Sequence, residues 1–393
     1  MGSTKTTLLT LLAIFALPGW AGAAENEEQL EQARQAAFQN GFATIVESLN
    51  LGTFDLFVGS IDKSDFVDRI FGLRLIDQNI KKGFGEDMVV QFEGMIKNGF
   101  RDSADGIKAT LLGVESRGDR GRAVVRYDLP ELQFSYHEYD LVLNENNQVV
   151  IVDWVDYLQG ERYTEAMGTS LVMGLPSEQA ARKLVDYQNI RESDLFQFTE
   201  LLKAARDRRA SRYVEILQGL SPELQRQRIV VLVTVQLAKT IRNRRFLRTA
   251  LVKMAEHFPE EPLYSLMLLD YYVPSKKFEE AVAALQRSYA RFDFDDAAME
   301  SRLSAITLAM GNNADASAFA DRAVTLEPGL ELGWWSALRA RVAIEDFAGA
   351  VEALQTLEQQ HGHSLGPDAL KGDKSFAPML ASAEFKSWVE SRE

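Results

Sequence analysis

Five side chains between positions 127 and 153 could carry out acid–base chemistry if the fold brings them together. They are Tyr127, Tyr136, His137, Tyr139 and Asp153. A histidine changes charge near neutral pH, and neighbouring phenol or carboxyl groups can orient it or bind a substrate. These groups could therefore meet in a pocket as acid, base or binding groups, with His137 as the histidine among them. The alternative is structural, because a lone histidine on a strand is more often a hydrogen-bonded or surface residue.

Motifs for other chemistries are missing from the sequence. His361-Gly-His363 lacks a third ligand at metal-binding spacing, and Gly83-Phe-Gly85 lacks the third glycine of a dinucleotide-binding loop. The chain has no cysteine, which excludes disulfides and thiolate catalysis. We therefore expect no metal, no cofactor and no enzymatic activity.

A basic block stands out in an otherwise acidic chain. The formal net charge of the whole chain is −14, yet the segment from Leu201 to Lys253 contains 13 Lys or Arg residues and only three acidic ones. Three-residue spacing places two groups of them on helical faces. These are Lys203, Arg206 and Arg209, and then Arg242, Arg245 and Arg248. The block predicts a dock for an anionic surface, such as an acidic protein segment or lipid head groups. Alternatively, these residues are solvated or pair with the acidic N-terminal part of the chain. The overall acidity argues against general nucleic-acid binding.

Residues 1–23 have the pattern of a cleaved secretory signal. Lys5 precedes an apolar stretch from Thr7 to Leu17, and Ala21-Gly22-Ala23 resembles a cleavage site. The apolar stretch is about half of the roughly 20 residues that a membrane-spanning helix needs, so we expect no span after cleavage. An exported chain without cysteine is typical of the bacterial periplasm, and secretion is the alternative location.

The elements that must position the acid–base candidates are strands. Helical periodicity over 25–50, 64–80 and 86–100 changes to strand patterns from Ile107 to Leu158. The apolar parity switches between the 132–136 and 139–143 runs, which predicts a bulge or bend near His137. The strand from Val149 to Leu158 is apolar on both faces in part, so we expect it to be central in the sheet.

Three helices followed by an antiparallel meander resemble the NTF2-like superfamily. The resemblance covers residues 25–165, and its motif runs from Tyr139 to Leu143 and from Val149 through Trp154 to Gly160. It implies an α+β fold in which a curved sheet forms a cone whose interior can hold a pocket. Cystatin-like or other α+β folds are the alternatives. Because that superfamily contains enzymes, binding modules and plain protein contacts, the resemblance selects no function.

The rest of the chain is predicted to be helical after a linker over 166–176. We expect helices at 177–190, 193–208, 210–218, 222–241, 244–257, 262–272, 276–291, 295–310, 313–326, 331–344, 346–361, 374–380 and 382–391. A 34-residue step relates Phe258, Phe292 and Leu326, and it recurs in Val282, Ala316 and Ala350. This period is typical of stacked helix-turn-helix repeats.

The windows between 258 and 362 resemble tetratricopeptide (TPR) repeats. Leu303, Ala316, Ala323 and Pro328 match the family pattern in one window, and Trp334, Ala350 and Leu354 match it in the next. The family's glycine in the first helix is absent, because Ser304 and Leu338 occupy its place. Residues 177–257 are expected to be a helical connector or degenerate repeats, and 363–393 to form capping helices.

In TPR repeats, first helices line a concave groove for a partner. The resemblance implies that this groove contains Tyr264, Met267, Tyr271, Ser301, Leu308, Trp335 and Arg339. Aromatic and arginine side chains are frequent anchors in protein interfaces. The first interpretation is therefore an exported, non-enzymatic scaffold that binds a protein partner through a TPR-like groove. The alternative is that the NTF2-like part binds a small molecule or is weakly catalytic, and that the repeats localise it.

Overall fold

The computed structural model describes residues 18–72, 87–88, 90–92, 94, 108–174, 181–182, 184–185 and 191–392. Several predicted segments fall wholly or mostly outside the described residues. These are residues 1–17 of the expected signal, the 73–80 end of the second helix, the helix over 86–100 and the helix over 177–190.

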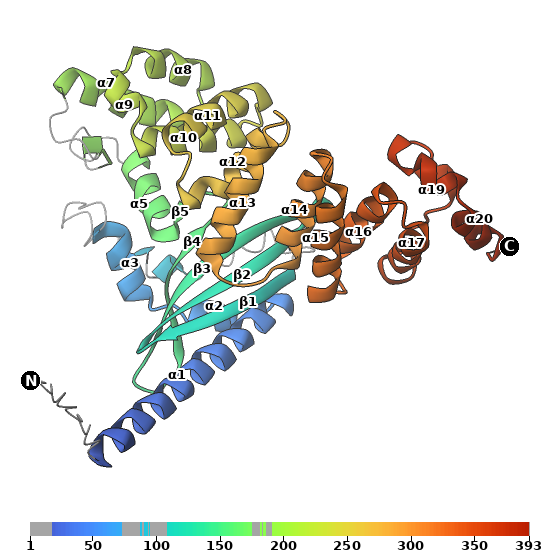
Figure 1. Ribbon diagram of the computed structural model, residues 1–393. Helices are drawn as coiled ribbons and strands as arrows, with labels where there is room; N and C mark the ends of the chain where they lie inside the picture. The colour runs from blue at the N-terminus through green and yellow to red at the C-terminus, as the bar shows by residue number, and fades with distance from the viewer. Residues whose placement is uncertain are drawn as a thin grey trace, which may run out of the picture.

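A long N-terminal helix and two short ones cover one face of a sheet. Helix α1 (Pro18–Asn50) runs along the sheet, and α2 (Asp55–Gly59) and α3 (Lys63–Gly72) follow it (Figure 1). The predicted helices over 25–50 and 64–72 are confirmed, although α1 begins earlier and therefore includes the expected cleavage region. The short helix α2 was not predicted.

The five strands form one antiparallel meander in chain order. They are β1 (Lys108–Arg117), β2 (Arg120–Leu129), β3 (Gln133–Leu143), β4 (Val149–Asp156) and β5 (Glu161–Arg162). Strand β4 lies between β3 and β5, as predicted for the strand from Val149, although the middle strand of the five is β3. Strand β4 does have neighbours on both sides, because β5 pairs with its end and the Ile151 amide donates to the Ser60 carbonyl at 2.7 Å.

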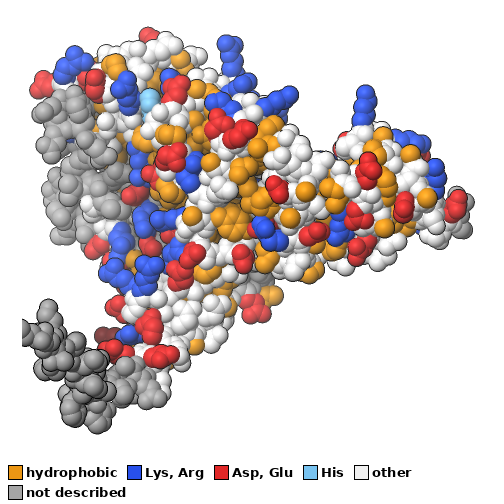
Figure 2. Space-filling model, viewed as in Figure 1, with side chains coloured by type: hydrophobic (Ala, Val, Ile, Leu, Met, Phe, Trp, Pro, Cys, Tyr) orange, Lys and Arg blue, Asp and Glu red, His pale blue; other side chains and the backbone are white. Residues whose placement is uncertain are grey.

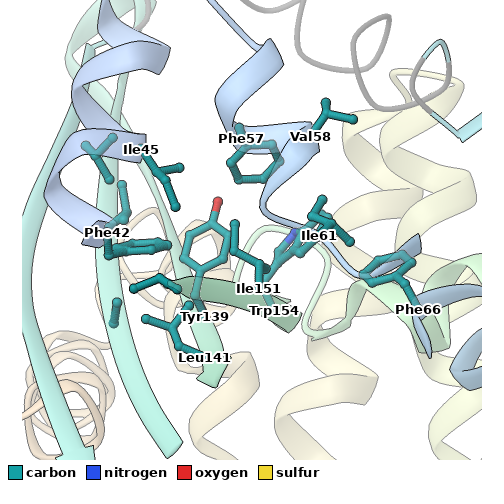
Figure 3. Close-up of a cluster of buried hydrophobic side chains, with 14 of the residues drawn as sticks. Phe42, Ile45, Phe57, Val58, Ile61, Phe66, Tyr139, Leu141, Ile151 and Trp154 are labelled. Carbon is teal, nitrogen blue, oxygen red and sulfur yellow. The ribbon is translucent and has the colours of Figure 1, made fainter. Parts of the chain in front are cut away.

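Both faces of the sheet are buried. On the face toward α1, Tyr139, Leu141 and Trp154 pack against Phe42 and Phe57 (Figure 3). On the opposite face, Phe134, Tyr136, Val155 and Tyr157 pack against Phe292 of the helical half. A strand that is buried on both faces needs no polar face, so its apolar residues can occupy both odd and even positions.

This two-sided burial explains the parity switch in β3. The β2–β3 register runs without interruption past His137, so the bulge predicted there is wrong. The irregularity lies instead in the β3–β4 pair, where Asp140 faces Asp153 and Leu141 faces Ile151. The extra residue in β4 is therefore Val152.

The C-terminal half is helical, as predicted. Its helices are α5 (Tyr163–Gly174), α7 (Glu192–Arg206), α8 (Ala210–Gly219), α9 (Pro222–Gln225), α10 (Arg228–Thr240), α11 (Arg244–His257), α12 (Ser265–Tyr272), α13 (Phe278–Phe292), α14 (Ala297–Ala309), α15 (Asn313–Leu326), α16 (Glu331–Ala343), α17 (Phe347–His361), α18 (Pro367–Leu370), α19 (Ala377–Ala381) and α20 (Ala383–Glu390). The expected linker is helix α5 over most of its length. The helix expected over 222–241 divides into α9 and α10.

The 34-residue step corresponds to equivalent places in every second helix. Phe292 and Leu326 end α13 and α15, and Phe258 directly follows α11. Ala316 and Ala350 are completely buried, as expected where two helices approach closely. Helices α14 and α15 pack as neighbours, and so do α16 and α17.

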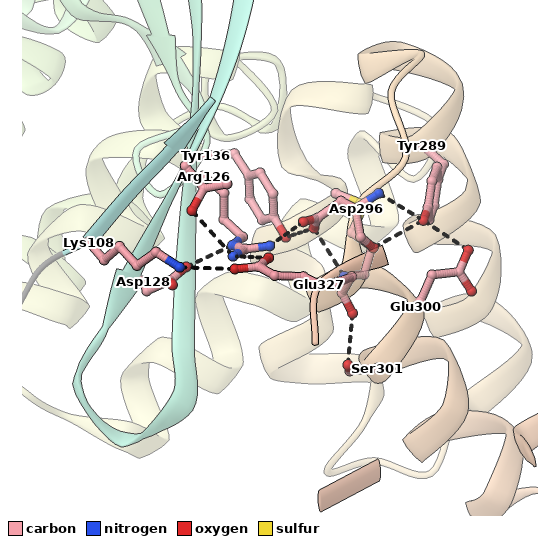
Figure 4. A network of polar contacts seen from close by, with 12 residues as sticks. Lys108, Arg126, Asp128, Tyr136, Tyr289, Asp296, Glu300, Ser301 and Glu327 are labelled. Atoms are coloured by element: carbon pink, nitrogen blue, oxygen red, sulfur yellow. Dashed lines mark hydrogen bonds and ion pairs between the residues drawn. The ribbon is translucent and has the colours of Figure 1, made fainter. Parts of the chain in front are cut away.

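A buried arginine connects the sheet to the helices. Arg126 of β2 bonds to Asp296 at 2.6 Å, to Glu327 at 2.7 Å and to Asp128 at 2.7 Å (Figure 4). Burial alone lowers the pKa of Arg126, but the three carboxylates outweigh it, so the net shift is upward. Asp296 also accepts a hydrogen bond from the Tyr136 hydroxyl at 2.6 Å and caps α14.

Close backbone contacts complete this junction. Arg122 of β2 donates to the carbonyls of Arg291 and Phe292 at the end of α13, at 2.6 and 2.8 Å. A cation at a helix C-terminus complements the free carbonyl groups. Gly160, at φ +74°, lies against Tyr264 and Met267 of the helical half. A side chain at this position would meet both of them.

Loss of the Arg126 side chain should strongly destabilise the protein. We expect Arg126→Met to lower the free energy of unfolding by about 3–5 kcal/mol, because Asp296 is left buried without its main ionic partner. Denaturation followed by tryptophan fluorescence measures the change. Arg34→Met, which removes only a partly exposed pair with Glu31, should cost less than about 1 kcal/mol. Equally small losses for both variants would contradict the proposed role of Arg126.

A second pair of variants tests the contact at Gly160. Gly52 shares a positive φ, +71°, but nothing lies within 4 Å of a Cβ built there. Gly52→Ala should therefore cost only the backbone strain, about 1–2 kcal/mol. Gly160→Ala should cost about 1–3 kcal/mol more, because its Cβ would lie 2.8 Å from the Met267 Sδ. The same denaturation measurement would show no difference between them if the contact were unimportant.

Candidate functional site

The expected TPR-type groove is largely occupied by the protein itself. Tyr264, Met267 and Ser301 are buried, with exposed fractions of 0, 3 and 0%. Tyr264 and Met267 lie under Gly160, and the Tyr264 hydroxyl accepts a hydrogen bond from Arg228 at 2.6 Å. These three residues therefore are not available to a partner, which corrects their assignment to an open groove.

The other four groove candidates do not form one surface. Tyr271 packs at the end of α12 with Lys277 over its ring, and Leu308 packs against a separate cluster of small residues on α15 and α16. Trp335 donates to Glu331 at 3.0 Å and meets the His363 ring edge-on. Arg339 is exposed, but it lies beside Asp373 and over the Phe376 ring. The C-terminal segment thus covers part of α16.

The acid–base candidates are only partly brought together. Tyr127 and Tyr139 share a hydrogen bond of 2.6 Å between their hydroxyls, and the His137 Nδ1 lies 3.1 Å from the Tyr139 hydroxyl. Tyr136 points to the opposite face of the sheet. The Asp153 carboxylate accepts a hydrogen bond from the Thr164 hydroxyl at 2.7 Å.

Aromatic rings surround His137. The ring centroids of Tyr127, Tyr139 and Trp154 lie 4.7, 5.8 and 6.4 Å from that of His137. Burial lowers the pKa of His137, and the nearby Asp156, 3.8 Å away, only partly opposes this. A neutral histidine packed among rings fits a structural role better than it fits catalysis in an open pocket.

The basic block divides into three groups according to its partners. Lys203, Arg206 and Arg209 lie close to acidic residues of their own segment, Glu200 and Asp207. A second group reaches the sheet half instead. Arg228 donates to the Gly160 carbonyl at 3.4 Å, and Lys239 donates to the Leu158 carbonyl at 2.9 Å.

The third group faces open space. Within the described part of the chain, Arg226, Arg242 and Arg245 form no ion pair and no side-chain hydrogen bond. Among the described residues, the side chain of Arg248 forms one hydrogen bond, to the Ser275 hydroxyl at 3.5 Å. Lys and Arg side chains also project from the helices in the upper part of the view in Figure 2.

Arg226 and Arg245 border a groove between α8, α10 and α11, which we call the α8–α11 groove. Its volume is about 990 Å³. Its floor is formed by apolar or buried side chains, namely Val214, Leu217, Val230, Val231, Thr234, Phe246 and Ala250. Its edge contains Arg226, Arg245, Lys253 and His257. None of the described residues that line it is acidic.

Helix geometry explains why these side chains converge. On α11, Arg245, Thr249 and Lys253 are spaced four residues apart and share one face. The Asn243 side chain caps this helix by accepting from the Phe246 amide at 3.0 Å, which sets where the face begins. Helix α10 is apolar on nearly all sides and buried from Ile229 to Val235, so it forms the base between its neighbours.

The charge of the groove does not depend on its histidine near neutral pH. Burial lowers the pKa of His257, and the positive charges of Lys253 and Arg226 lower it further, against Glu256. His257 is therefore neutral at pH 7, and the positive charge comes from the other three residues. Lys253 is partly neutralised by Glu256, at 2.6 Å.

Comparison with protein-family models gave no match, and comparison with curated proteins gave none either. Among the described residues, no helix combines the length and hydropathy that a bilayer span requires. The same residues contain no group of three His, Asp or Glu side chains placed to hold a metal ion. The arguments about function therefore depend on the α8–α11 groove and on the junction of the two halves.

Sequence reasoning identified the basic block but missed the groove. Of its six named arginines and lysines, only Arg245 lines the groove. The available signal was the set of apolar residues on α8 and α11, at Val214, Leu217 and Phe246, within the same block. These three side chains are only partly buried.

The groove's electrostatics can be tested through His257. We expect Lys253→Gln to raise the pKa of His257, because a positive charge beside the imidazole is removed. NMR titration of the imidazole protons measures this, since the chain has only four histidines. Arg242→Gln serves as the control, because Arg242 is not among the charges that act on His257. An unchanged His257 midpoint in Lys253→Gln would contradict the described electrostatics.

Proposed function

We propose that this chain is an exported, non-enzymatic scaffold that binds an acidic amphipathic helix of a partner protein in the α8–α11 groove. The observation that carries the proposal is an apolar groove edged by Arg226 and Arg245, neither of which has a partner within the described residues. An amphipathic helix places apolar residues into such a groove and leaves its polar face to the edges. Acidic residues on that polar face would pair with the two arginines.

The helical half supports a TPR-like scaffold in this proposal. Ala316 and Ala350 fill the small positions at helix crossings, and both are completely buried. Where the family has glycine, the Ser304 hydroxyl donates to the Ala316 carbonyl at 2.8 Å, so a larger residue is accommodated by a hydrogen bond. The NTF2-like part then acts as a support for the helices. Its second face packs against them.

The location in the periplasm is part of the proposal. It is supported by the signal pattern of residues 1–23, of which only 18–23 lie within the described residues. The alternative function, a ligand or weak catalysis in the cone, requires an open polar pocket around His137. The ring contacts of His137 make that alternative less well supported.

A designed peptide tests the groove directly. The probe is an amphipathic helical peptide with Leu on one face and Glu on the other, and its counterpart has Lys in place of Glu. We expect the Glu peptide to bind and the Lys peptide to bind at least tenfold more weakly, because the groove edge is positive. Binding of the Glu peptide should weaken as salt is added. Isothermal titration calorimetry measures both affinities.

Charge-reversal variants locate the site. Arg226→Glu and Arg245→Glu should each weaken binding of the Glu peptide about tenfold or more. Arg242→Glu is the matched control, because Arg242 is equally free of partners but does not line the groove. Equal effects of all three variants, or equal binding of the two peptides, would show that the groove is not the site.

A further inference from the structure

The turns that join the two helices of each pair share one backbone geometry. In each turn one residue has a positive φ, between 52 and 85°. The residue after it donates its amide to the carbonyl five positions earlier, at 2.9–3.1 Å. The residues with positive φ are Arg208, Arg242, Lys276, Gly311 and Glu345, which lie 34 or 35 positions apart. The 34-residue period therefore extends back to α7 and includes the pairs α7–α8, α10–α11 and α12–α13.

These turns lie along one edge of the helical half. Each pair contacts the next, through α7 and α10, then α11 and α12, then α13 and α14. Every first helix runs toward its turn and every second helix runs away from it, so stacking of the pairs brings the turns side by side. The Arg248 guanidinium of one pair accordingly donates to the Ser275 hydroxyl in the turn of the next pair, at 3.5 Å.

The first three turns are strongly basic. They comprise residues 206–209, 241–245 and 273–277, which we call the basic ridge. The ridge has one acidic residue, Asp207, and eight Lys or Arg residues, all of them exposed. The eight are Arg206, Arg208, Arg209, Arg242, Arg244, Arg245, Lys276 and Lys277. The equivalent turns over 310–312 and 344–346 contain no Lys or Arg. The positive charge is therefore confined to one part of an edge whose backbone geometry stays the same.

Most of the ridge cations have no partner in the protein. Arg206 and Arg209 lie 2.8 and 3.7 Å from Asp207, and Lys277 lies 3.7 Å from Glu280. Within the part of the chain that the structure describes, the other five form no ion pair and no side-chain hydrogen bond. These five are Arg208, Arg242, Arg244, Arg245 and Lys276. Clustered like charges repel one another, so an anionic partner would relieve this repulsion.

The shape of the basic ridge favours a lipid surface over an acidic protein segment. Its cations project from three separate turns, and of its residues only Asn243 and Arg245 line the α8–α11 groove. Val273, which is 38% exposed, and the exposed Pro274 lie in the third turn, next to Lys276. A lipid surface accepts cations at its phosphate groups and small apolar side chains just below them, without requiring a groove. An acidic helix requires a concave apolar surface, which the groove supplies and the ridge does not.

We propose that the basic ridge docks the helical half on a membrane surface rich in anionic phospholipid. The Lys and Arg side chains of the three turns contact lipid phosphate groups, and Val273 enters the interface. The α8–α11 groove meets the ridge at Asn243 and Arg245, so docking places the groove beside the membrane. Arg208, Arg242 and Lys276 do not line the groove, so this proposal and the proposed function are tested by different residues.

Co-sedimentation with lipid vesicles tests this proposal. One set of vesicles is phosphatidylcholine alone, and the other contains equal amounts of phosphatidylcholine and phosphatidylglycerol. Residues 24–393 are used, because the apolar stretch within 1–23 would itself bind lipid, and circular dichroism compares their fold with that of the full chain. We expect binding to the phosphatidylglycerol vesicles to be at least about tenfold tighter and to weaken as salt is added. The combined variant Arg208→Gln, Arg242→Gln and Lys276→Gln should weaken it about a hundredfold, or about fivefold for each charge.

Matched variants separate the ridge from net charge and from backbone effects. Arg120→Gln with Lys374→Gln and Lys386→Gln removes three exposed cations outside the ridge and should change vesicle binding by less than about twofold. Arg208→Lys with Arg242→Lys keeps both charges and should retain binding.

Three results would overturn the proposal. The first is equal binding to the two kinds of vesicle or binding to neither. The second is an equal loss for the two sets of three substitutions. The third is binding to polyglutamate without binding to the phosphatidylglycerol vesicles, which would assign the ridge to an acidic polypeptide. Failure of the designed peptide to bind the groove would leave each of these readouts unchanged.

Discussion

Arg126 lies completely buried between the sheet and the helices, and only one of its three carboxylate partners, Asp128, belongs to the sheet half. Two of its three carboxylate partners, Asp296 and Glu327, come from the helical half. Transferring a guanidinium from water into a protein interior costs several kcal/mol, which close carboxylates must offset. A separated sheet half would expose this arginine along with Phe134 and Tyr136. The arginine and the aromatic face around it therefore require the sheet and the helices to act as one unit.

This requirement decides which surfaces remain for other molecules. The helices that would line a TPR-type groove are α12 and α14, and the sheet half already occupies part of that side through Gly160, Tyr264 and Met267. The C-terminal segment covers part of α16 through Phe376. An open concave surface is found instead at the α8–α11 groove, which contains no residue of the sheet. A second cavity, of about 510 Å³, lies where the ends of β3 and β4 meet α10, α12 and α14.

Sequence patterns predicted the helices well, because periodicity and caps act locally. Helix α11 has the predicted bounds, and Asn243 caps it. Patterns failed where long-range packing decides the outcome. Apolar residues occupy both odd and even positions of β3. This pattern fits either a bulge or burial of the strand on two faces, and the packing of Phe292 on the second face shows that the strand is buried on both. The segment from Gly168 to Pro176 suggested a linker, whereas Gly168 and Thr169 are buried in α5, which packs against α3. Tyr264 and Met267 were wrongly placed in an open groove for the same reason, because the sheet half that covers them at Gly160 is not visible in a repeat.

The lysines and arginines of the basic block have different roles in the structure. Arg228 and Lys239 donate hydrogen bonds to backbone carbonyls of the sheet half, so both side chains are engaged within the molecule. Arg226 and Arg245 stay unpaired beside an apolar floor, in a chain whose net charge is −14. The acidic remainder of the surface repels a general polyanion, which disfavours nucleic acid and similar partners. In the proposed function, a ligand that combines local negative charge with an apolar face gains both interactions, so selection depends on the combination and not on charge alone.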